Sequence, residues 1–178
     1  MLYKYLPSFI FKRLFGNRQK YGLKINYEDE DFKKWQQNYI RFYNDNQKKN
    51  LGYVVNHFGF KVMKNIDLSN KIVLEVGPGI IDHLRYTKRR PYQYILADIN
   101  TDFLEESAKR LKRFGVKNII KLQVGGASIP IEDNSVDVLL TFHQLEHIYE
   151  LKKYLEELKR VLKPNGLLVG AVPTEGSI

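Results

Sequence analysis

The sequence predicts an α/β protein in which a doubly wound, mostly parallel sheet follows a helical N-terminal extension. From residue 71 onward, apolar runs typical of buried strands alternate with amphipathic segments, a pattern typical of parallel sheets with helices on both faces. The first run, Lys71–Ile80, passes into a glycine turn, where bare backbone N–H groups let a ligand approach closely. The second run ends in Asp98, 21 residues beyond Gly77. A carboxylate at that separation suits the hydroxyls of a ribose.

The expected elements follow one another in a regular order. Strands are expected at 71–76, 93–98, 118–124, 136–142 and 167–172. Helices are expected at about 80–89, from a cap at Asn100, Thr101 or Asp102 to Phe114, and at about 151–162. Pro91 and Gly115 stop the first two helices, and a turn at 163–166 leads into the last strand.

Ahead of the domain at 71–178, the sequence divides into a basic aromatic arm at 1–24 and a helical cap at 25–70. The arm contains six basic residues, no acidic residues and six interleaved aromatic residues. It therefore predicts either contact with anionic lipid or an arm that packs its aromatic side chains on its own domain. In the cap, apolar residues at helical spacing predict two helices, the second reaching Lys64 with Val62 facing inward.

Composition narrows the class of protein. The chain has 178 residues and no cysteines, which excludes disulfides and thiolate metal sites, and its four histidines show no metal-ligand spacing. No apolar run approaches the roughly 18 residues of a membrane span, and the start does not read as a secretory signal, so a cytoplasmic protein is expected. Of the net charge of +9, residues 1–70 supply most, with 13 Lys and Arg against 6 Asp and Glu. No nucleic-acid partner is therefore expected.

The glycine turn departs from the dinucleotide-binding fingerprint, because proline stands inside it and glutamate stands two residues before Gly77. The segment 74–79, Leu-Glu-Val-Gly-Pro-Gly, resembles instead the first motif of class I S-adenosylmethionine-dependent methyltransferases. Further resemblances follow in the order that this family shows, at Asp98, 125–130, 134–147 and 158–168. Five loose motifs in order make a specific signal, and the resemblance implies the Rossmann-like sheet of that family.

The resemblance also implies the cofactor, S-adenosylmethionine, and its product, S-adenosylhomocysteine. The implied cofactor-binding residues are Glu75, Val76, Gly77, Pro78, Gly79, Asp98, Ile99, Gly126, Ala127, Ser128 and Gln144. Glu75 would lie near the amino group of the cofactor, Asp98 would accept both ribose hydroxyls, and Ile99 would lie against the adenine. The alternative for Glu75 is a structural ion pair with a lysine, and the alternative for Asp98 is a helix N-cap.

Two histidines follow the fourth expected strand. A hydroxyl acceptor needs a base, an amine need only arrive unprotonated, and histidine titrates in the useful range. His143 is therefore the first candidate for a base or substrate contact, and His147 is the second. The Leu-Glu-His-Ile pattern is common in the family, so His147 has an alternative role in shaping the turn.

The function expected is methyl transfer to an oxygen or nitrogen atom of a small molecule. The basic aromatic arm suggests an acceptor related to a glycan or a lipid, and peripheral contact with the inner membrane face. Two departures, Gly126 at a frequent aspartate position and Ile81 at a glycine position, leave open a catalytically degenerate S-adenosylmethionine-binding or scaffold protein. A third possibility is an NAD-dependent oxidoreductase.

The family usually continues beyond the fifth strand with a helix and strands 6 and 7, which are missing before Ile178. Strand five would then form an open edge of the sheet. Three explanations stay open: a homodimer that pairs through this edge, cover by the N-terminal extension, or a truncated chain.

Overall fold

A computed structural model of the chain describes residues 59–125, 128–148 and 150–172, together with Glu30, Lys33, Lys34 and Asn38. These four N-terminal residues are helical, which agrees with a helix in the predicted cap. The arm predicted at 1–24 and most of the cap lie outside the described residues. Of the helices in the described part of the chain, none combines the length and the apolar character that crossing a membrane requires.

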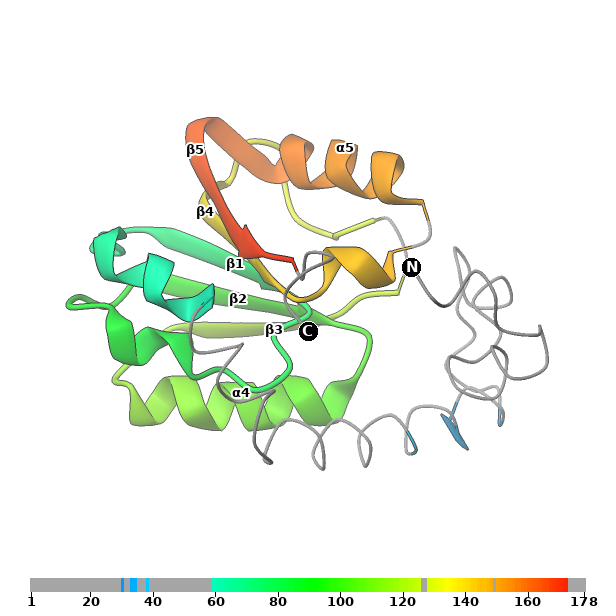
Figure 1. Cartoon of the computed structure of the whole chain (residues 1–178), viewed down its shortest axis with the longest axis horizontal. Helices are drawn as coiled ribbons and strands as arrows, with labels where there is room; N and C mark the ends of the chain where they lie inside the picture. The colour runs from blue at the N-terminus through cyan, green and yellow to red at the C-terminus, as the bar shows by residue number, and fades with distance from the viewer. Residues whose placement is uncertain are drawn as a thin grey trace.

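Five parallel strands form a sheet in the order β3-β2-β1-β4-β5 (Figure 1). The strands are β1 Ile72–Val76, β2 Gln93–Asp98, β3 Ile119–Gln123, β4 Val136–Phe142 and β5 Leu162–Ala171. The chain moves outward through β2 and β3 and then returns to the other side of β1 for β4. This reversal confirms the doubly wound fold, and it places the topological switch point between β1 and β4, where open α/β sheets bind ligands.

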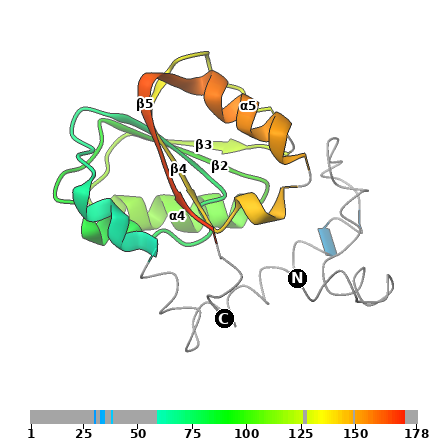
Figure 2. The same ribbon diagram turned by 45° about the horizontal axis from the view of Figure 1, so that its top comes forward.

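Two α-helices cover opposite faces of the sheet, as Figures 1 and 2 show. Helix α4, Thr101–Arg113, packs Leu104, Ala108 and Leu111 on one face, and helix α5, Leu151–Val161, packs Tyr154, Leu158 and Val161 on the other. Alternation along β1 sends Val73 to the α4 face and Leu74 to the α5 face. The central strands β1, β2 and β4 are therefore buried on both faces, as is typical of a parallel sheet.

The helix expected at 80–89 is wrong. The structure has only a short 3₁₀ helix, η3, at His83–Tyr86. Three side chains of this segment are buried, those of Ile81, His83 and Leu84. Side chains thus point inward at nearly successive positions and not along one stripe of a helix. Thr87 Oγ1 donates to the carbonyl of Leu84 at 3.0 Å. This side-chain hydrogen bond helps to close the turn where an α-helix would have continued.

The expected turn at 163–166 lies inside β5. Val136 pairs with Leu162 and Val138 pairs with Leu167, so extra residues of β5 bulge out between these two pairs. The second cap helix likewise ends early, in the 3₁₀ helix η2 at Lys61–Asn65. Val62 is 42% exposed, so the expectation that it faces inward is wrong.

Candidate cofactor-binding site

The glycine turn follows β1 directly, at the switch point. Gly77 and Gly79 have φ angles of 62° and 51°, a left-handed conformation that glycine adopts without steric cost. The backbone N–H of Gly77 donates to the carbonyl of Ala97 on β2 at 2.8 Å, which holds the turn against the neighbouring strand. A Cβ atom at Gly77 would lie 2.3 Å from Cγ of Gln144, so the Gln144 side chain covers this glycine.

The turn and the end of β2 meet in a direct contact. Asp98 is 7% exposed, and its carboxylate accepts hydrogen bonds from the backbone N–H groups of Gly79, Ile99 and Asn100, the last at 2.8 Å. Burial raises the pKa of Asp98 to about 7, although these backbone hydrogen bonds lower it. The structure thus brings together the two parts of the predicted pocket, since an amide of the turn touches the carboxylate at 98.

Residues of α4 and its N-cap support the contact between Gly79 and Asp98. Asn100 is the N-cap of α4, because its Oδ1 accepts from the backbone N–H of Asp102 at 2.9 Å. Asp98 is therefore not the cap. Farther along α4, the buried Ser107 donates through Oγ to the carbonyl of Gly79 at 2.9 Å. Sequence reasoning missed Ser107, for which no local motif gave a signal.

Glu75 lies in a buried polar group on the α4 face of β1. The hydroxyl of Tyr94 donates to Oε2 of Glu75 at 2.6 Å, and Nε2 of His83 lies 3.6 Å from the same oxygen. Burial and the nearby Asp98 together raise the pKa of Glu75 to about 8, although the hydrogen bond from Tyr94 lowers it. Burial also lowers the pKa of His83 to about 3. The lysine expected as an alternative partner of Glu75 is absent from these contacts. Sequence reasoning missed Tyr94 and His83, because the only signal of each was a polar atom within an apolar pattern.

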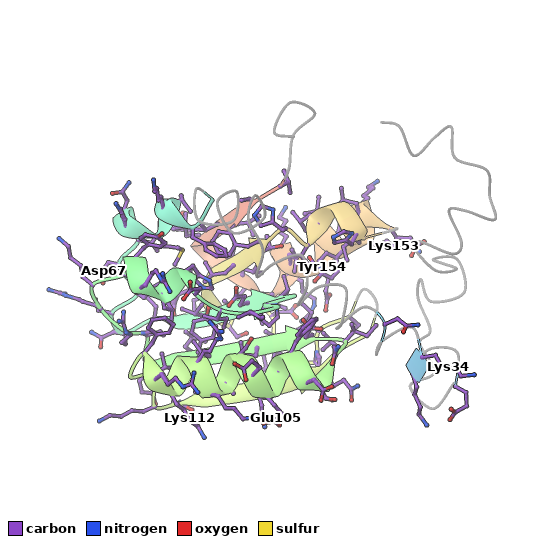
Figure 3. The ribbon with its side chains drawn as sticks, turned by 60° about the horizontal axis from the view of Figure 1, so that its bottom comes forward. Lys34, Asp67, Glu105, Lys112, Lys153 and Tyr154 are labelled. Atoms are coloured by element: carbon purple, nitrogen blue, oxygen red, sulfur yellow. The ribbon has the colours of Figure 1, made fainter. Side chains whose placement is uncertain are left out.

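Gln144 connects the turn to α5. Its side chain hydrogen-bonds with the hydroxyl of Tyr154, and its Oε1 accepts from Oγ1 of Thr141 at 3.4 Å. Tyr154 extends from α5 toward the sheet (Figure 3). Burial raises the pKa of its hydroxyl, and Asp98 is near enough to raise it as well. The sequence indicated Tyr154 only as part of the apolar stripe of its helix, so its hydroxyl at the site is a finding of the structure.

The two candidate catalytic histidines differ in their surroundings. His143 is half-buried with φ of 54°, and its backbone N–H donates to the carbonyl of Ala171 at 2.8 Å. A Cβ at Gly59 would lie 3.6 Å from its Nε2, so the imidazole lies beside Gly59. His147 is exposed at the end of the 3₁₀ helix Leu145–His147. Its backbone N–H donates to the Gln144 carbonyl, which fits the alternative role in shaping the turn.

The remaining predicted residues surround the same turn or lie on the loop after β3. Val76 and Pro78 are buried and Ile99 is half-buried, whereas Ser128 is exposed. Gly126 and Ala127 lie outside the described residues. The loop continues through Ile129 and Ile131, whose carbonyls accept from the guanidinium of Arg160 on α5 at 2.9 and 3.0 Å. Within the described residues, no group of three His, Asp or Glu could hold a metal ion.

The comparisons with known proteins identify the family. A family model described as a methyltransferase domain matches residues 74–170, which is more than half of the chain. The chain therefore belongs to the methyltransferase-domain family, and its sheet is that of the class I S-adenosylmethionine-dependent methyltransferases. S-adenosylmethionine is the cofactor of this family, as the resemblance implied.

Curated relatives match over part of their length. The ubiquinone/menaquinone biosynthesis C-methyltransferase UbiE of Haemophilus ducreyi is 36% identical over 78 residues, which cover 43% of this chain and 30% of the relative. An uncharacterized protein of Methanocaldococcus jannaschii is 34% identical over 107 residues, which cover 60% and 43%. The chain thus spans less than half the length of these relatives.

Solved structures show the same fold. A SAM-dependent methyltransferase from Aquifex aeolicus is 30% identical, with 58% of this chain and 57% of that chain covered and a TM-score of 0.50. A chain from the Haloferax volcanii complex of the Trm112 methyltransferase activator with a methyltransferase is 18% identical, covers 75% and 59%, and has a TM-score of 0.60. This second likeness shows the fold alone.

Proposed function

We propose that the chain transfers a methyl group from S-adenosylmethionine to an oxygen or nitrogen atom of a small molecule. The observation that carries the proposal is the contact between the Gly79 amide and the Asp98 carboxylate at the switch point. The residues present suit the cofactor. A Cβ would fill the cradle at Gly77, and Nδ2 of Asn100 is buried with no hydrogen-bond partner among the described residues, which is a polar atom that a ligand can satisfy.

Different residues of the site would contact different parts of the cofactor. The backbone at 77–79 would approach the methionine moiety, Asp98 would accept the ribose hydroxyls in place of its present backbone donors, and Ile99 would lie against the adenine. Glu75 would face the amino group, and Ser128, on the loop after β3, would contribute to the adenine side. When bound, the cofactor supplies a methyl group already activated by the positive sulfonium, so the protein chiefly supplies alignment and exclusion of water.

His143 is the proposed base or acceptor contact. It stands at the carboxyl end of β4, two residues beyond Thr141, and its imidazole lies close to the chain at Gly59. A half-buried imidazole can take a proton from an acceptor hydroxyl near neutral pH. His147 has weaker support, because it is exposed and its backbone amide closes a turn.

The acceptor is proposed by chemical class only. A glycan- or lipid-related acceptor rests on the basic aromatic arm, which lies outside the described residues. A carbon acceptor is a second candidate, because the name of the UbiE relative describes a C-methyltransferase. Incubation with radiolabelled S-adenosylmethionine and acceptors of each class separates these candidates, and His143→Gln should abolish transfer only to an acceptor that must lose a proton.

Calorimetric titration with S-adenosylhomocysteine tests the assignment of the site. The proposal expects binding that Asp98→Ala abolishes, followed by methyl transfer in the presence of an acceptor. Binding without transfer to any acceptor supports a catalytically degenerate relative. Release of a dinucleotide on denaturation of the purified protein, with no affinity for S-adenosylhomocysteine, supports an oxidoreductase.

Two interactions stay predictions with tests of their own. Leu167 and Leu168 are 42% and 46% exposed on β5, at the edge of the sheet, which favours a homodimer through that edge. Sedimentation measurements that find only a monomer at high concentration refute it. Equal flotation with anionic vesicles of the full chain and of a chain lacking 1–24 refutes the membrane contact.

A further inference from the structure

Three buried side chains form a hydrogen-bonded chain behind the glycine turn. The Tyr94 hydroxyl lies 2.6 Å from Oε2 of Glu75 and 3.1 Å from Nε2 of His83. Glu75 and His83 are each 1% exposed, and Tyr94 is fully buried. We call these three residues the Glu75 chain. They come from separate elements, since Glu75 is on β1, Tyr94 on β2 and His83 on η3.

The Glu75 chain can hold either protonation state of its carboxyl group. With Glu75 ionised, the single hydroxyl proton of Tyr94 goes to the carboxylate, and Nε2 of His83 donates its own proton to the tyrosine oxygen. With Glu75 protonated, the carboxyl proton goes to Tyr94, whose hydroxyl donates to an unprotonated Nε2, and the imidazole carries its proton on Nδ1 instead. The two states differ by one proton on Glu75, and the links Glu75–Tyr94 and Tyr94–His83 persist in both.

Among the described residues, no positive charge faces the Glu75 chain. The ring of His83 packs against Phe60 and Phe142, with centroid distances of 5.5 and 5.0 Å. From β4, the residue that pairs with Glu75 is the apolar Leu140. Among the described residues, the titratable groups that face Glu75 are Tyr94 and Asp98 from β2 and His83 from η3. The buried imidazole resists protonation, with a pKa lowered to about 3, so it cannot provide the missing charge.

A buried carboxylate without a counter-charge is costly, and a buried carboxyl group takes up a proton instead. The pKa of Glu75, raised to about 8, agrees with this geometry. A cation that arrives at the turn reverses the preference, because it supplies a charge that the described surroundings of Glu75 do not.

We propose that Tyr94 and His83 are positioning residues that hold Glu75 as a proton-coupled receptor for the cationic amino-acid end of S-adenosylmethionine. The step is a simple exchange: the cation binds, the O–H bond of Glu75 breaks, and the proton passes to solvent. This inference rests on the proposed function, because it requires the cofactor at the glycine turn. It adds that cofactor affinity is linked to proton release and that residues outside cofactor contact set this linkage.

Calorimetric titration of the whole chain with S-adenosylmethionine at pH 7, in two buffers with different ionisation enthalpies, measures the proton release. A group with a pKa of about 8 is roughly 90% protonated at pH 7, so the wild type should release about one proton more per cofactor than Glu75→Gln. Because both proteins bind the same ligand, the difference removes the titration of the cofactor's own amine.

Tyr94→Phe tests the positioning role without removing the carboxyl group. Loss of the hydroxyl donor should raise the Glu75 pKa further, so affinity should fall several-fold at pH 7 and recover toward the wild-type value at pH 9. Tyr92→Phe is the matched control, because Tyr92 lies two residues away and is 67% exposed; its affinity should equal the wild type at both pH values. A purely structural defect in Tyr94→Phe would not recover with pH.

The outcomes separate this inference from the function on which it rests. Absence of binding at millimolar S-adenosylmethionine refutes the cofactor assignment and the inference together. Tight binding with equal proton release in wild type and Glu75→Gln, or a Tyr94→Phe deficit that is the same at pH 7 and 9, refutes the inference and leaves the cofactor assignment standing. If Glu75→Gln fails to fold, the pH dependence of Tyr94→Phe decides alone.

Discussion

Gly77→Ala should damage both stability and cofactor affinity, and Gly115→Ala provides its matched control. Both glycines have positive φ angles, 62° and 86°, and a left-handed alanine costs about 1–2 kcal/mol. A Cβ at Gly115 would meet nothing within 4 Å, whereas a Cβ at Gly77 would lie 2.3 Å from Gln144 Cγ and 3.1 Å from its Cβ. Displacing Gln144 to a poorer rotamer costs about 1 kcal/mol more.

We therefore expect the free energy of unfolding to fall by about 1–2 kcal/mol in Gly115→Ala and by about 2–3 kcal/mol in Gly77→Ala. Urea denaturation of the cofactor-free proteins measures both values. In a Gln144→Ala background the excess cost of Gly77→Ala should largely disappear, because only the 3.1 Å contact to Cβ remains. This double-mutant cycle isolates the contact between the two residues.

The same variants should differ more sharply in affinity for S-adenosylhomocysteine. The added methyl group of Gly77→Ala would occupy space where the proposal places the cofactor, so calorimetry should detect no binding. Gly115 follows the C-terminal end of α4, near the amino ends of the strands, whereas the turn lies at their carboxyl ends. The Gly115 variant should therefore bind like the wild type. Equal affinity in the two variants would contradict a cofactor at Gly77, and an excess cost that persists without the Gln144 side chain would show that the Gln144 contact is not its cause.

Three further predictions concern other contacts of the domain. Ser107→Ala leaves the buried Gly79 carbonyl without the Oγ donor at 2.9 Å. We expect the free energy of unfolding in urea to fall by about 1–2 kcal/mol and the affinity for the cofactor to weaken several-fold. Unchanged values would show that the hydrogen bond does not support the turn. Arg160→Lys should destabilise the protein by about 2 kcal/mol, because one ammonium cannot serve Glu157 and the carbonyls of Ile129 and Ile131 together; a Tm equal to wild type would contradict this. The pKa values of Glu75 and Asp98 are raised to about 8 and about 7, so above about pH 4.5 the folded state keeps protons that the unfolded state has lost. The stability of the cofactor-free protein should therefore fall between pH 5 and 8.5, and it should fall less in Glu75→Gln. A stability that rises over this range would contradict the raised pKa values.

Periodicity alone predicted much of the sheet. The bounds of β2 and β4 agree with the expected 93–98 and 136–142 because each strand is mostly apolar and a polar residue marks its end, Asp98 in β2 and His143 directly after β4. The helix at 80–89 was wrong because pattern reasoning could not see that His83 turns inward to Tyr94. Tertiary hydrogen bonding outweighed local helical spacing at that point.

The candidate site was predictable where the chain itself provides the geometry. The glycine turn and Asp98 each stand at the end of an apolar run, and parallel pairing of β1 with β2 brings these ends to one edge. Tyr94, Ser107 and Tyr154 were not predictable as site residues, because each contributes one polar atom from an otherwise apolar position. Such a contact depends on packing between distant elements, which no short motif encodes.

A crystal structure of the chain with S-adenosylhomocysteine is the decisive test of the proposed cofactor site. We expect the methionine moiety against the backbone at 77–79 and the ribose hydroxyls on the Asp98 carboxylate, with Gln144 moved off Gly77. A nucleoside seated elsewhere on the sheet, or crystals grown in millimolar S-adenosylhomocysteine that retain the present contact between the Gly79 amide and Asp98, would contradict it.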